Sequence, residues 1–278
     1  MATQIFPPQT KAAKVSLPWG AKIDVEISEA IGREIFNQRI FDIGLSELAW
    51  RVVAPGARVL DVGANIGYFS SLLAARCRRE GVVHAFEPHP VIHETLRRNV
   101  APQNLAPTAG KVILHACALG GAKGEARLIE TDYFGINHGT ARIAEHSGEA
   151  ELRVHSVPME TLDGLFPSDS FDLMKIDVEG FETRVLEGAA SLLREKRIRN
   201  IVYEDHEWRQ GGLAEIFRKR GYSVFAVGYD FWGPRLQEAG EKICINEGWE
   251  SPNFLASLDG DAALKAAEPR GWRVLSNR

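Results

Sequence analysis

Short apolar runs alternate with segments of helical periodicity through the middle of the chain. The apolar runs predict six strands, at 58–62, 82–86, 112–119, 171–176, 198–203 and 222–227. After the first of them, Phe69, Leu72, Leu73 and Cys77 recur at i, i+3, i+4 and i+8, the spacing of one helix face. Strands alternating with helices favour a doubly wound, mainly parallel α/β sheet covered on both faces.

The flanks of this pattern are less regular. Residues 15–27 alternate around Trp19-Gly20 and predict a hairpin, whereas residues 31–53 carry a helical pattern that ends before Pro55-Gly56. Residues 120–158 interrupt the alternation and predict extra strands and a loop. No linker divides the chain, so we expect one domain, with an N-terminal extension over residues 1–54 packed on a main body over residues 55–278.

Composition narrows the class of partner. The chain has 278 residues, 25% of them charged, and a formal net charge of −4. Proteins that bind nucleic acid usually carry a basic excess, so a nucleic-acid partner is not favoured. The three cysteines are far apart, no apolar run is long enough for a membrane span, and residues 1–14 lack the apolar core of a signal peptide. A cytoplasmic protein is expected.

A glycine turn after the first strand predicts a ligand site. Val59 to Gly67 reads Val-Leu-Asp-Val-Gly-Ala-Asn-Ile-Gly, a strand that enters a helix through Gly63 and Gly67. Glycines let the backbone approach a ligand, and the helix N-terminus offers unpaired N–H groups. In open α/β sheets, ligands bind outside the carboxyl ends of the strands, where this turn lies.

An acidic residue ends the second strand. Glu87, in Phe86-Glu87-Pro88, lies 87 − 67 = 20 residues beyond Gly67, the offset of an acid that binds ribose hydroxyls. The glycines have the spacing Gly-x-x-x-Gly, which does not fit a dinucleotide fingerprint, and the chain contains no P-loop. Asp61 would repel a pyrophosphate but attract the amino group of a methionine moiety.

These residues resemble those of the FkbM family of methyltransferases. The resemblance rests on Leu60 to Gly67, on Phe86-Glu87-Pro88, and on Lys175-Ile176-Asp177-Val178-Glu179-Gly180-Phe181-Glu182, the most specific block. It covers about residues 45–228. It implies a class I methyltransferase (Rossmann-like) fold over residues 55–278, use of S-adenosylmethionine, and O-methylation of a small molecule, natural product or sugar.

The resemblance also implies a set of cofactor-binding residues. By position, Asp61, Gly63, Asn65 and Gly67 would border the methionine part, Glu87 would hold the ribose, and Ala118 and Leu119 would flank the adenine. The adjacent Ala64 and Pro88, and Asp177 at the end of the fourth strand, complete the expected cofactor site.

Acidic residues at the ends of two later strands are candidates for methyl transfer. Asp177 and Glu179 are two residues apart, so in extended backbone both would project to one side, and their proximity would raise one pKa. The fifth strand ends in Glu204, Asp205 and His206, and His206 is a second candidate base. We therefore expect Asp177, Glu179 and His206 to be catalytic and Glu204 to contact the substrate.

Other polar residues support weaker expectations. The glycine-flanked loop that contains Asn137 and His138 lies in the insertion, and these two residues are expected to contact the substrate. His89 and His93 have the i, i+4 spacing of a metal pair, but no third ligand is evident, so we assign no metal and expect a solvated helix face.

Several alternatives stay open. A carboxylate acceptor needs no base, and N-methylation of a small molecule is also compatible with the motifs. Methylation of a base in nucleic acid is less favoured, because Asp177-Val178-Glu179-Gly180 lacks the Pro-Pro-aromatic block of such enzymes. A non-catalytic nucleotide-binding protein is the remaining alternative. A homo-oligomer is possible.

Overall fold

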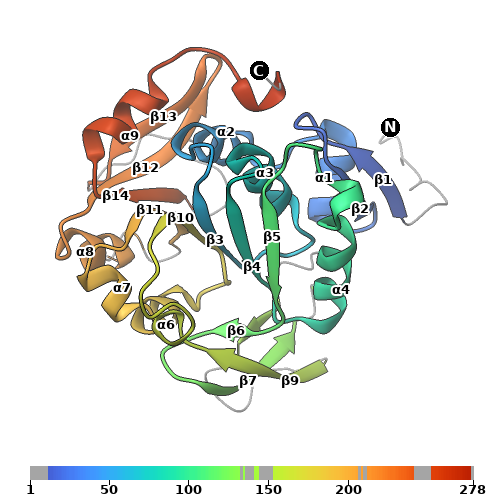
Figure 1. Ribbon diagram of the computed structural model, residues 1–278, viewed down its shortest axis with the longest axis horizontal. Helices are drawn as coiled ribbons and strands as arrows, with labels where there is room; N and C mark the ends of the chain where they lie inside the picture. The colour runs from blue at the N-terminus through green and yellow to red at the C-terminus, as the bar shows by residue number, and fades with distance from the viewer. Residues whose placement is uncertain are drawn as a thin grey trace, which may run out of the picture.

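A single mixed sheet forms the centre of the molecule (Figure 1). The computed structural model describes residues 12–131, 134, 141–143, 153–205, 208, 212–240 and 252–276. The strands of this sheet are β3 (Arg58–Val62), β4 (Val82–Phe86), β5 (Lys111–His115), β10 (Phe171–Ile176), β11 (Ile198–Glu204), β12 (Ser223–Asp230), β13 (Gly233–Glu238) and β14 (Asn253–Ser257). Their order is β13-β12-β14-β11-β10-β3-β4-β5.

The sheet is parallel from β11 to β5 and antiparallel from β13 to β11. Strands β11, β10, β3, β4 and β5 pair in parallel, whereas β14 runs antiparallel to both β11 and β12. The chain moves outward from β3 in one direction through β4 and β5, and in the other through β10 and β11. The strand order therefore reverses between β3 and β10, the point where α/β sheets bind ligands.

Helices cover both faces of this sheet, which confirms the predicted doubly wound α/β class. One face packs against α2 (Ile43–Val52), α3 (Tyr68–Cys77) and α9 (Gly260–Ala267), and the other against α5 (Leu162–Leu165), α6 (Glu182–Glu187), α7 (Ala190–Arg194) and α8 (Gly212–Arg218). Helix α4 (Pro90–Asn99) packs near β4 and β5 through Leu96. The predicted apolar face of α3, from Phe69 to Cys77, is buried.

The N-terminal segment contains the predicted hairpin but not the predicted single helix. The hairpin is β1 (Ala12–Ser16) and β2 (Lys22–Glu26), and its Trp19 ring donates to Ser71 of α3. Residues 31–53 form two helices, α1 (Ala30–Gln38) and α2, because Arg39 and Asp42 adopt left-handed φ angles of 59° and 39°. The Asp42 carboxylate then caps α2 by accepting from the Leu45 N–H.

The insertion forms a second, smaller sheet, as expected from the break in the pattern. It comprises β6 (Ala118–Leu119), β7 (Gly124–Glu130), β8 (Arg142–Ile143) and β9 (Arg153–Glu160), in the order β6-β9-β7-β8. Figure 1 shows it below the central sheet, next to β4, β5 and α4. The prediction of one strand over 112–119 is wrong at its end: β5 stops at His115, and Ala118 and Leu119 pair with β9.

The C-terminal part contains elements that the sequence pattern did not predict. β14 lies between β11 and β12, so the predicted sixth strand exists but does not neighbour the fifth. No sequence motif after Gly228 predicts β13 or α9. The 3₁₀ turns are η1 (Pro102–Asn104) and η4 (Arg273–Leu275). Among the described helices, none combines the length and hydropathy needed to cross a bilayer.

A buried ion pair joins the N-terminal segment to the C-terminal one. Arg51 and Glu47 of α2 are 2.5 Å apart, and both side chains are fully buried. The Arg51 guanidinium also donates to the carbonyls of Ala267, Pro269 and Gly271. Glu47 accepts from the Val274 N–H. Besides this ion pair, both charged groups therefore hydrogen-bond to backbone groups more than 200 residues away in the chain.

We predict that Arg51→Met lowers the free energy of unfolding by about 3–5 kcal/mol, because it leaves the Glu47 carboxylate buried without its counter-charge. Urea denaturation at pH 7 measures the change. The control is Arg97→Met, which breaks the exposed Arg97–Glu94 pair and is expected to leave the free energy of unfolding nearly unchanged. Equal effects of the two substitutions would contradict this assignment.

Candidate functional site

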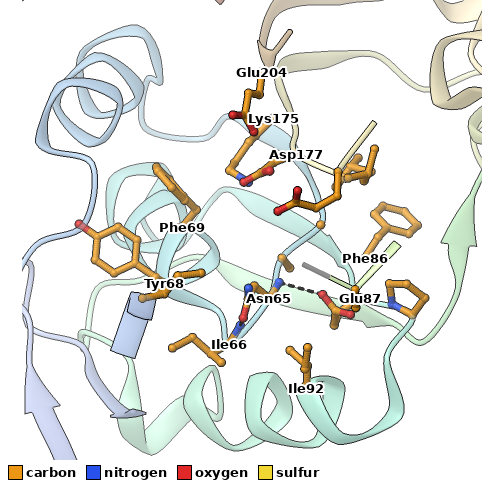
Figure 2. Close-up of a pocket in the computed structure, with 18 of the residues that line it drawn as sticks. Asn65, Ile66, Tyr68, Phe69, Phe86, Glu87, Ile92, Lys175, Asp177 and Glu204 are labelled. Carbon is orange, nitrogen blue, oxygen red and sulfur yellow. Dashed lines mark hydrogen bonds and ion pairs between the residues drawn. The ribbon is translucent and has the colours of Figure 1, made fainter. Parts of the chain in front are cut away.

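A cavity of about 320 Å³ opens at the carboxyl ends of β3, β4, β10 and β11 (Figure 2). This volume lies in the range of small-molecule sites. Four groups of residues line the cavity: the turn after β3, the ends of β4 and β6, the ends of β10 and β11, and the N-terminal helices. They include Gly63, Ala64, Asn65, Glu87, Pro88, Ala118, Leu119, Lys175, Asp177, Glu179, Glu204, Phe41 and Asp42.

The turn after β3 requires glycine at residue 63. Gly63 has a φ of +77°, and a Cβ there would lie 1.8 Å from the carbonyl oxygen of Asp177. The Gly63 N–H donates to the Phe86 carbonyl, and the Asp177 N–H donates to that of Val62. These contacts hold the ends of β3, β4 and β10 together and form the floor of the cavity.

Asn65 and Gly67 shape the rest of that turn. Asn65 adopts a left-handed φ of 48°, a conformation in which asparagine is found more often than most residues. Its side-chain Oδ1 accepts from the Ile66 N–H. Gly67, with a φ of +90°, precedes α3, and a Cβ there would lie 2.8 Å from Leu96. Gly67 does not line the cavity. Its lack of a side chain instead lets the turn pack against Leu96 and Val100.

The Glu87 carboxylate is held in a fixed position at one side of the cavity. One oxygen accepts from the Asn65 N–H at 3.0 Å and the other from the His89 N–H at 2.8 Å. Glu87 is only 7% exposed, and burial raises its pKa to about 7, against the two backbone hydrogen bonds, which lower it. Because a carboxylate has about four acceptor positions, capacity remains for further donors.

Lys175 links two acids at the opposite side. Its ammonium donates to Asp177 at 3.0 Å and lies 4.0 Å from Asp61. Burial alone would lower the pKa of Lys175, but Asp177 and Asp61 outweigh burial and raise it. Lys175 also lies over the Phe69 ring, 5.1 Å from its centroid. Lys175 therefore stays charged within an apolar strand.

Asp61 lies behind the cavity wall. Its side chain is fully buried, and one oxygen accepts from Ser70 at 2.6 Å. The other oxygen accepts no hydrogen bond within the described part of the chain. Burial raises the pKa of Asp61, whereas Lys175 and Ser70 lower it. The predicted contact of Asp61 with a cofactor stays a prediction, since Asp61 does not line the cavity in this conformation.

Three acids from β10 and β11 gather at this second side. Figure 2 shows Asp177 and Glu204 near Lys175, away from Glu87. Burial, followed by the charge of Asp177, raises the pKa of Glu179 to about 7. Burial, Asp177 and Glu179 together raise the pKa of Glu204 to about 8. Near neutral pH, this cluster therefore contains carboxyl groups that can exchange protons.

The backbone that carries these acids differs from the expected one. β10 ends at Ile176, and Glu179 adopts a left-handed φ of 55°, so residues 177–179 are not extended as predicted. The turn still places Glu179 in the cavity. Glu182 stabilises this turn, because its carboxylate accepts from the N–H groups of Val178 and Gly180.

Other predicted site residues are separate from this cavity or cannot be placed. Asn137, His138 and His206 lie outside the described residues. We expected His89 and His93 to lie on a solvated helix face, and this expectation is wrong for His89, which is 1% exposed. His93 Nδ1 lies 3.2 Å from the Glu87 carbonyl, whereas His89 Nε2 lies 3.3 Å from Glu130, so the two rings do not form a pair.

Sequence reasoning missed several residues that line the cavity. Lys175 was quoted within its motif but given no role, although a lysine within an apolar strand is itself a signal. The other missed residues come from segments without recognised motifs: Ile31, Glu34 and Leu45 from the N-terminal helices, Phe41 and Asp42 from the turn between them, Arg142 and Ile143 from β8, and Asn253 from β14.

Comparisons with known proteins identify the family of the chain. The model of the methyltransferase FkbM domain matches residues 61–224. The 31-O-demethyl-FK506 methyltransferase FkbM of Streptomyces tacrolimicus is 33% identical over 248 residues, which cover 76% of this chain and 88% of that protein. Methyltransferase 1 of Beauveria bassiana is 28% identical over 240 residues, which cover 77% of this chain and 87% of that protein.

Two further matches cover only part of the similar protein. The AMB antimetabolite synthetase AmbE of Pseudomonas aeruginosa is 29% identical over 95% of this chain, but the chain spans only 13% of its length. A crystal structure of a methyltransferase FkbM from Methylobacillus flagellatus aligns with a TM-score of 0.44 and 15% identity, covering 72% of this chain and 43% of that one.

The sheet order, the glycine turn and the strand-terminal acid are those of the class I methyltransferase fold. With the match over residues 61–224 and the 33% identical relative, the chain belongs to the FkbM family of methyltransferases.

The raised pKa values predict how stability depends on pH. Glu87 and Glu204 have folded-state pKa values of about 7 and about 8, above that of an unfolded glutamate. Their contribution to stability is present below the unfolded pKa and is lost as pH rises through the folded values. We predict that the Tm of the ligand-free protein falls as pH rises from about 4.5 to about 8 and then levels off.

In Glu204→Gln this fall is expected to be smaller by roughly 2–4 °C, because the substituted side chain no longer ionises. Differential scanning calorimetry at each pH measures it. Glu94→Gln serves as the control, because Glu94 is exposed and pairs with Arg97 at the surface. An unchanged pH dependence in Glu204→Gln would show that Glu204 does not titrate in this window.

Proposed function

We propose that this protein transfers a methyl group from S-adenosylmethionine to a hydroxyl oxygen of a small molecule, natural product or sugar. The observation that carries the proposal is the arrangement of one cavity. A fixed acceptor carboxylate, Glu87, lies at one side. At the other side lies an acidic cluster of Asp177, Glu179 and Glu204, in which Glu179 and Glu204 can exchange protons near neutral pH.

The residues of the cavity fit this cofactor. Glu87 is oriented by two backbone N–H groups and keeps acceptor capacity for the two ribose hydroxyls. Ala118 and Leu119 offer small and apolar contacts for the adenine, and the turn from Gly63 to Asn65 exposes backbone beside the methionine part. When bound, the cofactor supplies a methyl group activated by a sulfonium.

The acidic cluster can complete the chemistry at a hydroxyl acceptor. Methyl transfer requires the acceptor oxygen in line with the methyl group and the removal of its proton. Glu204, whose pKa is raised to about 8, and Glu179, at about 7, can take up this proton near neutral pH. Lys175 orients Asp177 by donating to it, so that Asp177 can contact the cofactor or the acceptor.

The charge of the cavity bears on the choice of acceptor. A carboxylate acceptor would face Asp177, Glu179 and Glu204, and like charges would repel it. The same repulsion disfavours nucleic acid, whose phosphates are anionic, in agreement with the net charge of −4. The name of the FK506 relative specifies methylation at an oxygen. N-methylation of a small molecule is the alternative, and a screen of hydroxyl and amine acceptors would distinguish the two.

We also propose that the protein works in the cytoplasm. Cys77 and Cys117, the cysteines in the described residues, are free and buried, as in a reducing compartment. A homo-oligomer remains an expectation that size-exclusion chromatography with light scattering would decide.

The cofactor proposal predicts micromolar binding of S-adenosylmethionine and S-adenosylhomocysteine in calorimetric titrations. Glu87→Ala is expected to weaken both at least about 30-fold, because it removes the acceptor of two ribose hydroxyls. Glu125→Ala, an exposed acid on β7, is the control and is expected to bind normally. Binding of NAD with no binding of either methionine-derived nucleoside would overturn the proposal.

The catalytic proposal predicts that Glu204→Gln lowers kcat by about 100-fold or more while affinity for S-adenosylhomocysteine changes little, because the base does not hold the cofactor. In the wild type, turnover of a hydroxyl acceptor should rise with pH through an apparent pKa near 7–8, with the base ionised above it. Asp177→Asn and Glu179→Gln, assayed in parallel, show how the role is divided. If all three variants keep full turnover, the acidic cluster is not the base.

A further inference from the structure

Three ionisable side chains meet outside the cavity, where the insertion sheet contacts the central fold. His89, which precedes α4, lies 3.3 Å through Nε2 from an oxygen of Glu130 on β7. His155 on β9 lies 2.8 Å through its own Nε2 from the same oxygen. The His89 and Glu130 side chains are 1% and 11% exposed, and that of His155 is 24% exposed. Phe134 stacks on the His89 ring at 4.8 Å.

Three such ligands could hold a metal ion, but the protonation of His89 argues against one. His89 Nδ1 accepts from the Ile92 N–H at 3.4 Å and so caps α4. A neutral imidazole has one proton, so this contact assigns it to Nε2, which then donates to Glu130. A metal would need Nε2 bare and the proton on Nδ1, facing the Ile92 N–H.

The electrostatics of Glu130 agree with a hydrogen-bonded cluster. Burial alone would raise the pKa of Glu130, but the hydrogen bonds from His155 and His89 outweigh burial and lower it. Glu130 is therefore ionised at neutral pH and accepts from both rings, and hydrogen bonds to an ionised acceptor are the stronger kind. We call His89, Glu130 and His155 the histidine clasp.

The clasp is connected to the cofactor side of the cavity through backbone. The N–H of His89 donates to Glu87, so displacement of His89 would displace one of the two donors that orient this carboxylate. The same strand β9 that carries His155 pairs at its other end with Ala118 and Leu119, which line the cavity. The insertion sheet thus lines part of the cavity directly, and through the clasp it also contacts the segment that orients Glu87.

We propose that the histidine clasp positions Glu87 for cofactor binding, with Glu130 and His155 acting through His89 as positioning residues. This inference rests on the proposed function, because it takes Glu87 to be the ribose acceptor. It adds that Glu130 and His155, two residues of the insertion sheet that do not line the cavity, contribute to cofactor affinity without touching the cofactor.

The test is calorimetric titration of matched variants with S-adenosylhomocysteine. Glu130→Ala and His155→Leu are expected to weaken binding about 10-fold, as loss of a charge-assisted hydrogen bond implies. His155→Gln, whose amide can donate from nearly the same place as Nε2, should restore most of the affinity. The matched control is Glu125→Ala, because Glu125 on β7 also bonds to β9, through Ser156, but on the exposed side.

A double-mutant cycle separates positioning from general destabilisation. If Glu130 acts through Glu87, Glu130→Ala should weaken binding about 10-fold in the wild type but less than about 2-fold in a Glu87→Gln background. Equal losses in both backgrounds, or a loss in Glu125→Ala as large as in Glu130→Ala, would overturn the proposal. Circular dichroism of each variant confirms that it is folded.

Two further outcomes are informative. Binding of one equivalent of Zn²⁺ in a titration of the wild type with zinc chloride, lost in His155→Leu, would overturn the clasp in favour of a metal site. Failure of the wild type to bind S-adenosylhomocysteine would overturn the proposed cofactor, and with it this role of the clasp. Normal wild-type binding together with unchanged binding by Glu130→Ala would overturn the clasp alone.

Discussion

The close approach of two backbone segments at the strand-order reversal is the constraint on which the site depends. A Cβ at Gly63 would lie 1.8 Å from the Asp177 carbonyl oxygen, so the turn after β3 and the end of β10 fit together only with glycine there. This contact brings the segment that orients Glu87 and the segment that carries the acids to the same opening. Both sides of the cavity therefore depend on one packing contact.

Much of the central fold could be predicted from periodicity, because local patterns determine strands and helices that are buried on both sides. β3, β4, β10 and β11, and the buried face of α3, follow directly from such patterns. The break between α1 and α2 was not predicted, because it depends on left-handed backbone at Arg39 and Asp42. Arginine gives no signal for that conformation, and a single aspartate within a helical pattern is only a weak one. β14 was missed because its place between β11 and β12 is a matter of long-range pairing.

The candidate site shows the same division. Asn65 and Glu87 were recognised because their motif and spacing are local, and the structure joins them by a hydrogen bond. The acidic cluster was foreseen from strand ends, but the left-handed turn at Glu179 and the support by Glu182 were not. The wall formed by the N-terminal helices, β8 and Asn253 could not be found in a sequence, because nothing local links those segments to the cavity.

The position of β14 also has a consequence for the order in which the chain folds during synthesis. β11 pairs with β10 on one edge and with β14 on the other, and β12 reaches the sheet only through β14. During synthesis, the outer edge of β11 therefore stays unpaired while about 50 further residues are translated. Unpaired strand edges tend to pair with strands of other chains. A chaperone that binds extended apolar segments would have its best opportunity there, before Asn253–Ser257 emerges and closes the edge.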